Sequence, residues 1–386
     1  MQNFQFANPT KIIFGKDEIK RLPKEIPSES KVLVLYGGGS VKKTGLLEAI
    51  KEVLKDYQLG EFGGIEPNPT YETLMKAVEL IRKENYDFLL AVGGGSVIDG
   101  TKFIAAAVPF TQGDPWELVE KHLSIDTALP FATVLTLPAT GSEMNNGAVI
   151  TRKALQAKLP FFSPVTFPRF SILDPIYTYT LPDKQIANGV VDAFVHVMEQ
   201  YLTYPVAGKV QDRFAEGLLL TLVEEGPIAL QNPENYDVRA NIMWTATLAL
   251  NGLIGSGVPQ DWSTHMVGHE ITALYGLDHA QTLAIVLPSM LEVMKEEKEA
   301  KLLQYSERIW NIDVNLSSAE KIELAIEKTR NFFETMGVKT RLSDYSLGEE
   351  TIEKVIAGLK AHGMVKLGEK GTVTTEVVRQ VLGLSL

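Results

Sequence analysis

The sequence predicts an α/β domain built on a mainly parallel sheet, followed by a mostly helical domain. Short apolar segments rich in β-branched residues alternate with helical periodicity in the first half, and turns rich in glycine and hydroxyl groups follow them. This strand pattern fades after residue 175. The chain has 386 residues, which exceeds the size at which a single core usually stops growing, so we expect two domains. We place the boundary at Pro182, giving domains 1–182 and 183–386.

Composition excludes several classes of protein. The formal net charge is −11 and no cluster of lysine or arginine is present, so neither nucleic acid nor an anionic membrane is expected as the main partner. The absence of cysteine excludes disulfide bonds and thiolate chemistry. Residues 1–9 lack the basic and apolar regions of a secretory signal. The uncharged run at 241–260 contains glycine, asparagine and proline, so it predicts a buried helix and loop. We therefore expect a cytoplasmic protein.

Three strands are expected in the first domain, at residues 31–36, 87–92 and 131–137, with helices at 46–54 and 71–85. Beyond Pro288 the pattern predicts charged helices, which we place at 291–307 and 318–336.

Each predicted strand ends in a turn of glycine or hydroxyl residues, at 37–40, 93–96 and 140–142. Open α/β sheets bind ligands at the carboxyl ends of their strands, where backbone N–H groups and helix N-termini can hold phosphate. These turns therefore favour nucleotide binding, although Lys42 and Ile98 occupy the last position of G-x-G-x-x-G. The alternative is that the turns are purely structural, and that residues 96–99 form a variant capping box.

Four of the six histidines lie between residues 190 and 280, together with one acid. Asp192 and His196 stand four residues apart, as do His265 and His269, so each pair shares a helical face, and His279 follows a glycine turn. One carboxylate with imidazoles suits Zn²⁺ or Fe²⁺ better than Ca²⁺ or Mg²⁺. The alternative is a set of hydrogen-bonded core histidines. With phosphate loops in the first domain and this cluster in the second, we expect the active site in the cleft between them.

These motifs resemble the iron-containing (group III) alcohol dehydrogenase family over nearly the whole chain. The family's Asp-x-x-x-His and His-x-x-x-His motifs match residues 192–196 and 265–269, and its glycine and Thr-Gly-Ser loops match residues 93–99 and 140–143. Residues 36–43 and 66–69 are most similar to the NADPH-dependent aldehyde reductase and butanol dehydrogenase branch. The resemblance implies a dehydroquinate synthase-like architecture and an NADP(H)-linked, metal-dependent, reversible reduction of short-chain aldehydes to primary alcohols by a homodimer.

The resemblance also implies roles for individual residues. It makes Asp192, His196, His265 and His279 the ligands of one Fe²⁺ or Zn²⁺ ion, and leaves His269 as a catalytic residue that relays a proton or as a residue that orients a ligand. The implied cofactor contacts are Gly37, Gly38, Gly39, Ser40, Lys43, Asn68, Gly94, Gly95, Ser96, Asp99, Thr136, Thr140, Ser142, Asn145 and Lys158.

Three other functions are compatible with such a cluster. A polyol oxidoreductase similar to glycerol dehydrogenase would use the same architecture, whereas a dehydroquinate synthase would need basic residues for a phosphorylated substrate, and none cluster here. A metal-dependent hydrolase would use the same ligands to ionise water and would ignore nucleotide.

NADPH is expected over NADH because the first strand ends without an acid. A carboxylate there would accept hydrogen bonds from the ribose of NADH and repel the 2′-phosphate of NADPH. Gly37, Gly38, Gly39 and Ser40 can instead donate to phosphate, and Lys42 or Lys43 can add positive charge, although a lysine pair commonly just faces solvent.

Overall fold

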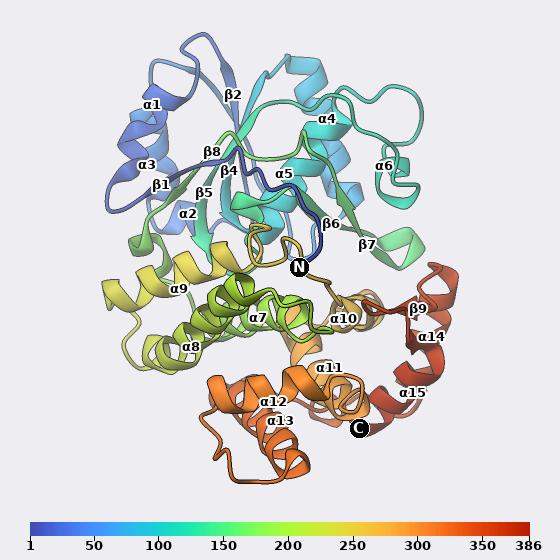
Figure 1. Cartoon of the computed structure of the whole chain (residues 1–386). Helices are drawn as coiled ribbons and strands as arrows, with labels where there is room; N and C mark the ends of the chain where they lie inside the picture. The colour runs from blue at the N-terminus through green and yellow to red at the C-terminus, as the bar shows by residue number, and fades with distance from the viewer. The chain divides into compact units, whose positions relative to one another are not determined.

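The computed structural model describes all 386 residues, and the chain forms two compact units (Figure 1). The first, called here the sheet unit, comprises Ala7–Leu181 and Glu234–Thr247. The second, called the helical unit, comprises Met1–Phe6, Pro182–Pro233 and Leu248–Leu386. Each unit is therefore discontinuous in sequence.

The sheet unit is built on six parallel strands in the order β1-β8-β5-β4-β2-β3. The strands are β1 (Lys11–Phe14), β2 (Lys31–Tyr36), β3 (Gln58–Phe62), β4 (Phe88–Gly94), β5 (Phe131–Leu137) and β8 (Phe170–Leu173). The three predicted strands are β2, β4 and β5, which lie side by side in the middle of the sheet. They read as continuous apolar runs because helices bury both faces of a parallel sheet. The predicted α/β class is confirmed.

Helices cover the sheet and position its loops. The helices of the sheet unit are α1 (Leu22–Glu25), α2 (Ser40–Lys43), α3 (Leu46–Val53), α4 (Tyr71–Glu84), α5 (Gly95–Ala107), α6 (Glu117–Glu120) and most of α9 (Tyr236–Ala249). Alternate side chains of the central strands, such as Val32 and Val34, pack with Leu47 and Ile50 of α3. Helix α5 is almost wholly buried, and an antiparallel pair, β6 (Gly147–Arg152) and β7 (Ala157–Phe162), packs beside it.

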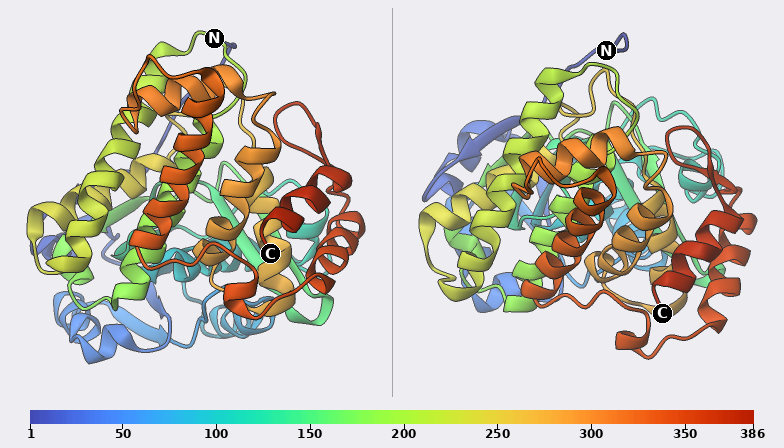
Figure 2. Two further views of the ribbon diagram at one scale, coloured as in Figure 1. Left: turned by 90° about the horizontal axis from the view of Figure 1, so that it is seen from below. Right: turned by 60° about the horizontal axis from the view of Figure 1, so that its bottom comes forward.

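Figure 2 shows the helical unit from two further directions, and its helix α7, which is buried from Gly189 to Tyr201, packs against α8 and α11. Its helices are α7 (Asp183–Tyr201), α8 (Lys209–Gln231), α10 (Ser263–Tyr275), α11 (His279–Val293), α12 (Glu299–Arg308), α13 (Ser318–Thr335), α14 (Glu350–Ala361) and α15 (Thr375–Leu384). One core joins α10, α11, α14 and α15. The unit is not entirely helical, because β9 (Lys366–Leu367) and β10 (Val373–Thr374) form a short antiparallel pair.

One detail of the predicted helices changes. The helix predicted at 291–307 is two helices, because α11 ends at Val293 and α12 begins at Glu299. The uncharged run at 241–260 is a helix to Ala249 followed by a loop, as the sequence predicts. No helix in the structure has the length and apolar character that crossing a bilayer requires.

Candidate metal centre and cofactor loops

Three helices bring the predicted metal ligands together. Asp192 and His196 lie one turn apart on α7, where nearly every side chain from Gly189 to Tyr201 is buried. His265 lies in the first turn of α10. His279 is the first residue of α11 rather than a loop residue, and Asp278 before it forms a capping box with Gln281.

The geometry of the four side chains fits a divalent metal ion. Oδ1 of Asp192 lies 3.7 Å from Nε2 of His196, 4.0 Å from Nε2 of His265 and 3.6 Å from Nε2 of His279. All four donor atoms lie within 4.8 Å of one another. With bonds of about 2.0–2.2 Å, the ligand atoms of a tetrahedral site are about 3.3–3.6 Å apart. One carboxylate and three imidazoles are also a suitable donor set for Fe²⁺ or Zn²⁺.

His269 lies beside this group but outside it. Its ring centroid is 5.0 Å from that of His279 and 6.2 Å from that of His265. The side chain is buried, and His269 is not a member of the four-residue donor group. Among the four ligands, His279 has the most exposed side chain, at 21 %, so the cluster is most accessible on the side of His279.

The buried Glu199, which the sequence analysis missed, orients His265. Its Oε2 accepts a hydrogen bond from Nδ1 of His265, and its Oε1 accepts one from the backbone N–H of Thr264 at 2.7 Å. This bond leaves Nε2 of His265 available as the metal donor, an arrangement common around protein metal ions. Burial raises the pKa of Glu199 well above its ordinary value, and Asp261 adds to the effect. The spacing 192, 196, 199 on one face of an apolar helix was the signal in the sequence.

The loop after β2 is open where the sequence predicts phosphate binding. A Cβ atom at Gly38 would meet nothing within 4 Å, and Gly39 has a φ of +96°, a conformation that suits glycine. Lys43 is exposed, and no ion pair involves it. Lys42 instead lies 3.5 Å from Glu61 and over the ring of Tyr36.

Glu61 is an acid near this loop that the sequence analysis did not consider. It lies on β3, which pairs with β2, and it forms ion pairs with Lys42 and Lys51. The hydrogen bond from Lys51 holds the pKa of Glu61 below its ordinary value. The carboxylate is therefore charged and already paired with two lysines.

The second and third loops form one hydrogen-bonded network. Asp99 on α5 accepts a hydrogen bond from Oγ of Ser142 at 2.6 Å and one from the backbone N–H of Val149 at 2.9 Å. Oγ1 of Thr140 accepts from the N–H of Ser142, and Nδ2 of Asn145 donates to the carbonyl of Gly141 at 2.9 Å. The capping-box alternative for residues 96–99 is wrong, because α5 begins at Gly95 with no side-chain cap.

The glycines of the second loop have a packing reason. A Cβ atom at Gly94, the last residue of β4, would lie 2.9 Å from Cβ of Leu137 on β5, and one at Gly95 would clash with the side chain of Thr140 in the loop after β5. The close approach of the turn between β4 and α5 to β5 and its loop thus requires glycine at both positions, whether or not a ligand binds.

The other predicted cofactor residues are more dispersed. Ser96 lies in the first turn of α5, Thr136 near the end of β5, Asn68 just before α4, and Lys158 is buried on β7. Burial raises the pKa of Asp99, and the positive charge of Lys158 opposes this shift. No hydrogen bond or ion pair joins Lys43 or Asn68 to the Asp99 network.

Comparison with known proteins identifies the family. Residues 9–175 match the family model described as iron-containing alcohol dehydrogenase, and residues 186–382 match the C-terminal model of the Fe-containing alcohol dehydrogenase family. The chain belongs to the iron-containing alcohol dehydrogenase family.

Several relatives of this alcohol dehydrogenase cover its whole length. It is 59% identical over 383 residues to the NADPH-dependent aldehyde reductase YqhD of Escherichia coli (strain K12), covering 99% of each chain. It is 42% identical over 390 residues to the probable NADH-dependent butanol dehydrogenase 1 of Bacillus subtilis (strain 168), covering 100% of each. The structure of NADH-dependent butanol dehydrogenase A from Thermotoga maritima has a TM-score of 0.95 and 34% identity, and the match covers 100% of this chain and 99% of that one.

In this iron-containing alcohol dehydrogenase, a buried lysine supports the predicted cofactor loops. Nζ of Lys102 donates to Oδ1 of Asn145 at 2.8 Å and to the carbonyl of Gly147 at 2.7 Å. Burial lowers the pKa of Lys102 to about 7, although Asp99 and Glu143 raise it. This role of Lys102 was not predicted from the sequence, although the residue follows Asp99 by about one helical turn.

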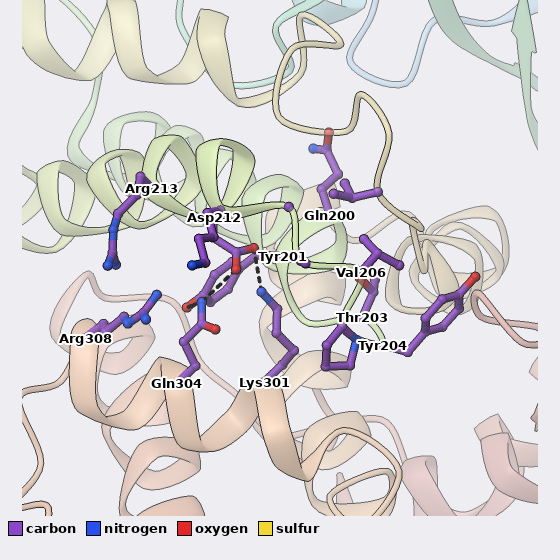
Figure 3. Close-up of a pocket in the computed structure, with 15 residues that line it drawn as sticks. Gln200, Tyr201, Thr203, Tyr204, Val206, Asp212, Arg213, Lys301, Gln304 and Arg308 are labelled. Atoms are coloured by element: carbon purple, nitrogen blue, oxygen red, sulfur yellow. Dashed lines mark hydrogen bonds and ion pairs between the residues drawn. The ribbon is translucent and has the colours of Figure 1, made fainter. Parts of the chain in front are cut away.

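The alcohol dehydrogenase also has a surface pocket of about 350 Å³ between the end of α7 and the start of α8 (Figure 3). None of the four predicted metal ligands lines it. Lys301 pairs with Asp212 at 2.6 Å, and Arg213 and Arg308 both pair with Glu216 at 2.6 Å. Burial would raise the pKa of Glu216, but hydrogen bonds from Arg308 and Arg213 hold it below its ordinary value. Because none of the predicted metal ligands or cofactor residues lines it, we assign the pocket no part in catalysis.

Proposed function

We propose that the protein reduces short-chain aldehydes to primary alcohols with NADPH, reversibly and with the help of one divalent metal ion. The observation that carries the proposal is the buried cluster of one aspartate and three histidines, whose donor atoms lie within 4.8 Å of one another. The substrate and cofactor classes are supported by the relative at 59% identity, which is named as an NADPH-dependent aldehyde reductase. Relatives at 42% identity are named for NADH and butanol, so the choice of cofactor needs its own test.

In this proposal Asp192, His196, His265 and His279 hold Fe²⁺ or Zn²⁺. An ion bound there supplies Lewis acidity toward the oxygen of an aldehyde, and NADPH supplies the hydride. The protein fixes the orientation of the ligand side chains. Glu199 keeps Nε2 of His265 directed at the cluster, and the buried surroundings keep bulk water away from Asp192 and His196.

We assign proton delivery to His269. The buried imidazole lies next to His279 and is outside the donor set, so it can hold a proton close to the reacting atoms without losing it to a metal bond. It would give this proton to the oxygen of the product alcohol, directly or through one water molecule. In alcohol oxidation the same nitrogen would take the proton back.

His269→Ala should lower kcat by about 10²–10⁴-fold while the metal content stays near that of the parent. The reason is that the substitution removes a proton carrier and leaves all four donors. Metal analysis and steady-state kinetics on the same preparation test it. Loss of metal as complete as in His265→Ala would make His269 a ligand and contradict this role.

The sheet unit would hold the dinucleotide. The loop of Gly37, Gly38, Gly39, Ser40 and Lys43 would take the adenosine 2′-phosphate, because Lys43 is exposed and no ion pair involves it. The remaining contacts in the proposal are Asn68, Gly94, Gly95, Ser96, Asp99, Thr136, Thr140, Ser142, Asn145 and Lys158. We further propose that residues 1–182 and 183–386 are the cofactor and metal-binding domains of a cytoplasmic homodimer.

The deciding experiment mixes purified protein with NADPH and butanal and follows the nicotinamide absorbance. We expect oxidation of NADPH that a chelator abolishes and that added Zn²⁺ or Fe²⁺ restores. Matched reactions contain glycerol with NADP⁺ or NAD⁺, or an ester without nucleotide. Faster oxidation of glycerol would favour a polyol oxidoreductase, and metal-dependent ester hydrolysis without nucleotide would favour a hydrolase; either result would overturn the proposal.

A further inference from the structure

A strained turn precedes the helix that carries His265. Trp262 has a φ of +63°, a left-handed conformation that a non-glycine residue keeps only where its surroundings hold it. Asp261 provides the restraint. Its Oδ1 accepts hydrogen bonds from the backbone N–H of Ser263, at 2.9 Å, and from the hydroxyl of Ser263. The Asp261 carboxylate thus holds the first residue of α10.

Asp261 is also tied to the carboxylate that orients His265. The backbone N–H of Asp261 donates to the carbonyl of Glu199 at 2.9 Å. The side chains of Asp261 and Glu199 then accept the N–H groups of Ser263 and Thr264, the first two residues of α10. Carboxylate oxygens that accept the first N–H groups of a helix stabilise its N-terminus, and here they fix the turn from which the His265 ring projects.

A buried lysine holds Asp261 in place. Nζ of Lys298 lies 2.8 Å from Oδ2 of Asp261 and 3.1 Å from a carboxylate oxygen of Glu369, and it donates to the carbonyl of Leu202 at 2.7 Å. The side chains of Lys298, Asp261 and Glu369 are 3%, 6% and 5% exposed. Burial would lower the pKa of Lys298, but the two carboxylates raise it above its ordinary value, so the lysine is charged.

Glu369, the second carboxylate that binds Lys298, lies in the loop between β9 and β10. This loop passes close to Asp261, because a Cβ atom at the neighbouring Gly368, which has a φ of +81°, would lie 3.5 Å from Oδ1 of Asp261. Figure 1 shows β9 beside α10, far along the chain from it. Glu369 therefore shares the lysine with Asp261 but has no hydrogen bond to α10.

We propose that Asp261, held by Lys298, is a positioning residue for His265, a role that rests on the ligand set proposed above. Metal sites need their donors held within about 0.5 Å, and the restraint must come from groups around the ligands. Asp261 restrains His265 through two hydrogen bonds. Its side chain accepts the first N–H of α10, and its backbone N–H donates to the carbonyl of Glu199. Removal of the carboxylate's charge releases Lys298 from it and loosens the turn at Trp262.

The test compares Asp261→Asn with Glu369→Gln. Each removes one carboxylate charge from the same lysine, but only the first changes the group that binds α10. Affinity for Zn²⁺ is measured by competition with a coloured chelator, the coordination geometry by the visible spectrum of Co²⁺-loaded protein, and Tm on metal-free protein. We expect Asp261→Asn to weaken metal binding by about 10–100-fold and to change the Co²⁺ spectrum. Glu369→Gln should lose a comparable amount of Tm and keep the affinity and spectrum of the parent.

The outcomes separate this inference from the proposed function. Equal affinities for Asp261→Asn and the parent, or equal losses in both variants, would reduce Asp261 to a stabilising residue and overturn the inference alone. A parent that binds no metal would overturn the proposed function and the inference with it. Asp261→Glu is a second variant, should Asp261→Asn fold poorly. It keeps the charge, displaces the carboxylate, and should shift the Co²⁺ spectrum; an unchanged spectrum would contradict the positioning role.

Discussion

Replacing Asp192 by Asn, or His265 by Ala, is expected to remove the bound metal and lower kcat/KM for an aldehyde by about a thousandfold or more. Asp192 is the single charged donor, and its Oδ1 lies within 4.0 Å of all three imidazole nitrogens. Loss of the Lewis acid removes several kcal/mol of stabilisation from the negative charge that develops on oxygen, and about 4 kcal/mol corresponds to about a thousandfold. Elemental analysis and steady-state kinetics measure the two effects.

His122→Asn is the matched control for the metal-site variants. His122 is an exposed histidine of the sheet unit with a φ of +48°, a conformation that asparagine tolerates well. This variant should keep both metal and activity. If folded Asp192→Asn and His265→Ala proteins also retained the metal content and activity of the parent, the four-ligand assignment would be wrong.

Gly38→Asp is expected to lower kcat/KM with NADPH by about fivefold to several hundredfold, and to weaken or reverse any preference for NADPH over NADH. A new carboxylate near the 2′-phosphate costs about 1–4 kcal/mol at a separation of about 4 Å, depending on how far solvent screens it. The substitution should not disturb the fold, because a Cβ at Gly38 meets nothing within 4 Å and the φ of Gly38 is not left-handed. The same change at Gly39, with its φ of +96°, would also strain the backbone.

The neutral isostere Gly38→Asn separates charge from shape in this experiment. It should lose much less activity with NADPH than Gly38→Asp, and its discrimination between NADPH and NADH should stay near that of the parent. Equal effects of the two substitutions, or a parent enzyme that favours NADH, would show that the 2′-phosphate is not recognised at this loop.

The central part of the fold was readable from the sequence because its signals are local. Strands β2, β4 and β5 lie in the middle of the sheet, and burial on both faces makes them uniformly apolar. The edge strand β3 was not predicted, since its residues from Gln58 to Phe62 are only partly buried and carry no clear pattern. The short pair β6 and β7 was missed for a related reason, because its pairing is decided by packing beside α5.

In the candidate site, too, the local features could be predicted from the sequence and the contacts between distant segments could not. Spacing alone determined that Asp192 faces the same way as His196, and His265 the same way as His269, because four residues are about one helical turn. Spacing did not decide that His279 belongs to the group while His269 lies beside it. The family resemblance implied this, and the packing of α7, α10 and α11 brings it about. The supporting groups Glu199, Lys102 and Asp261 acquire their roles from partners on other segments. A sequence specifies the chemical types and local faces of such residues, whereas hydrogen bonds and ion pairs between distant segments form only in the folded chain.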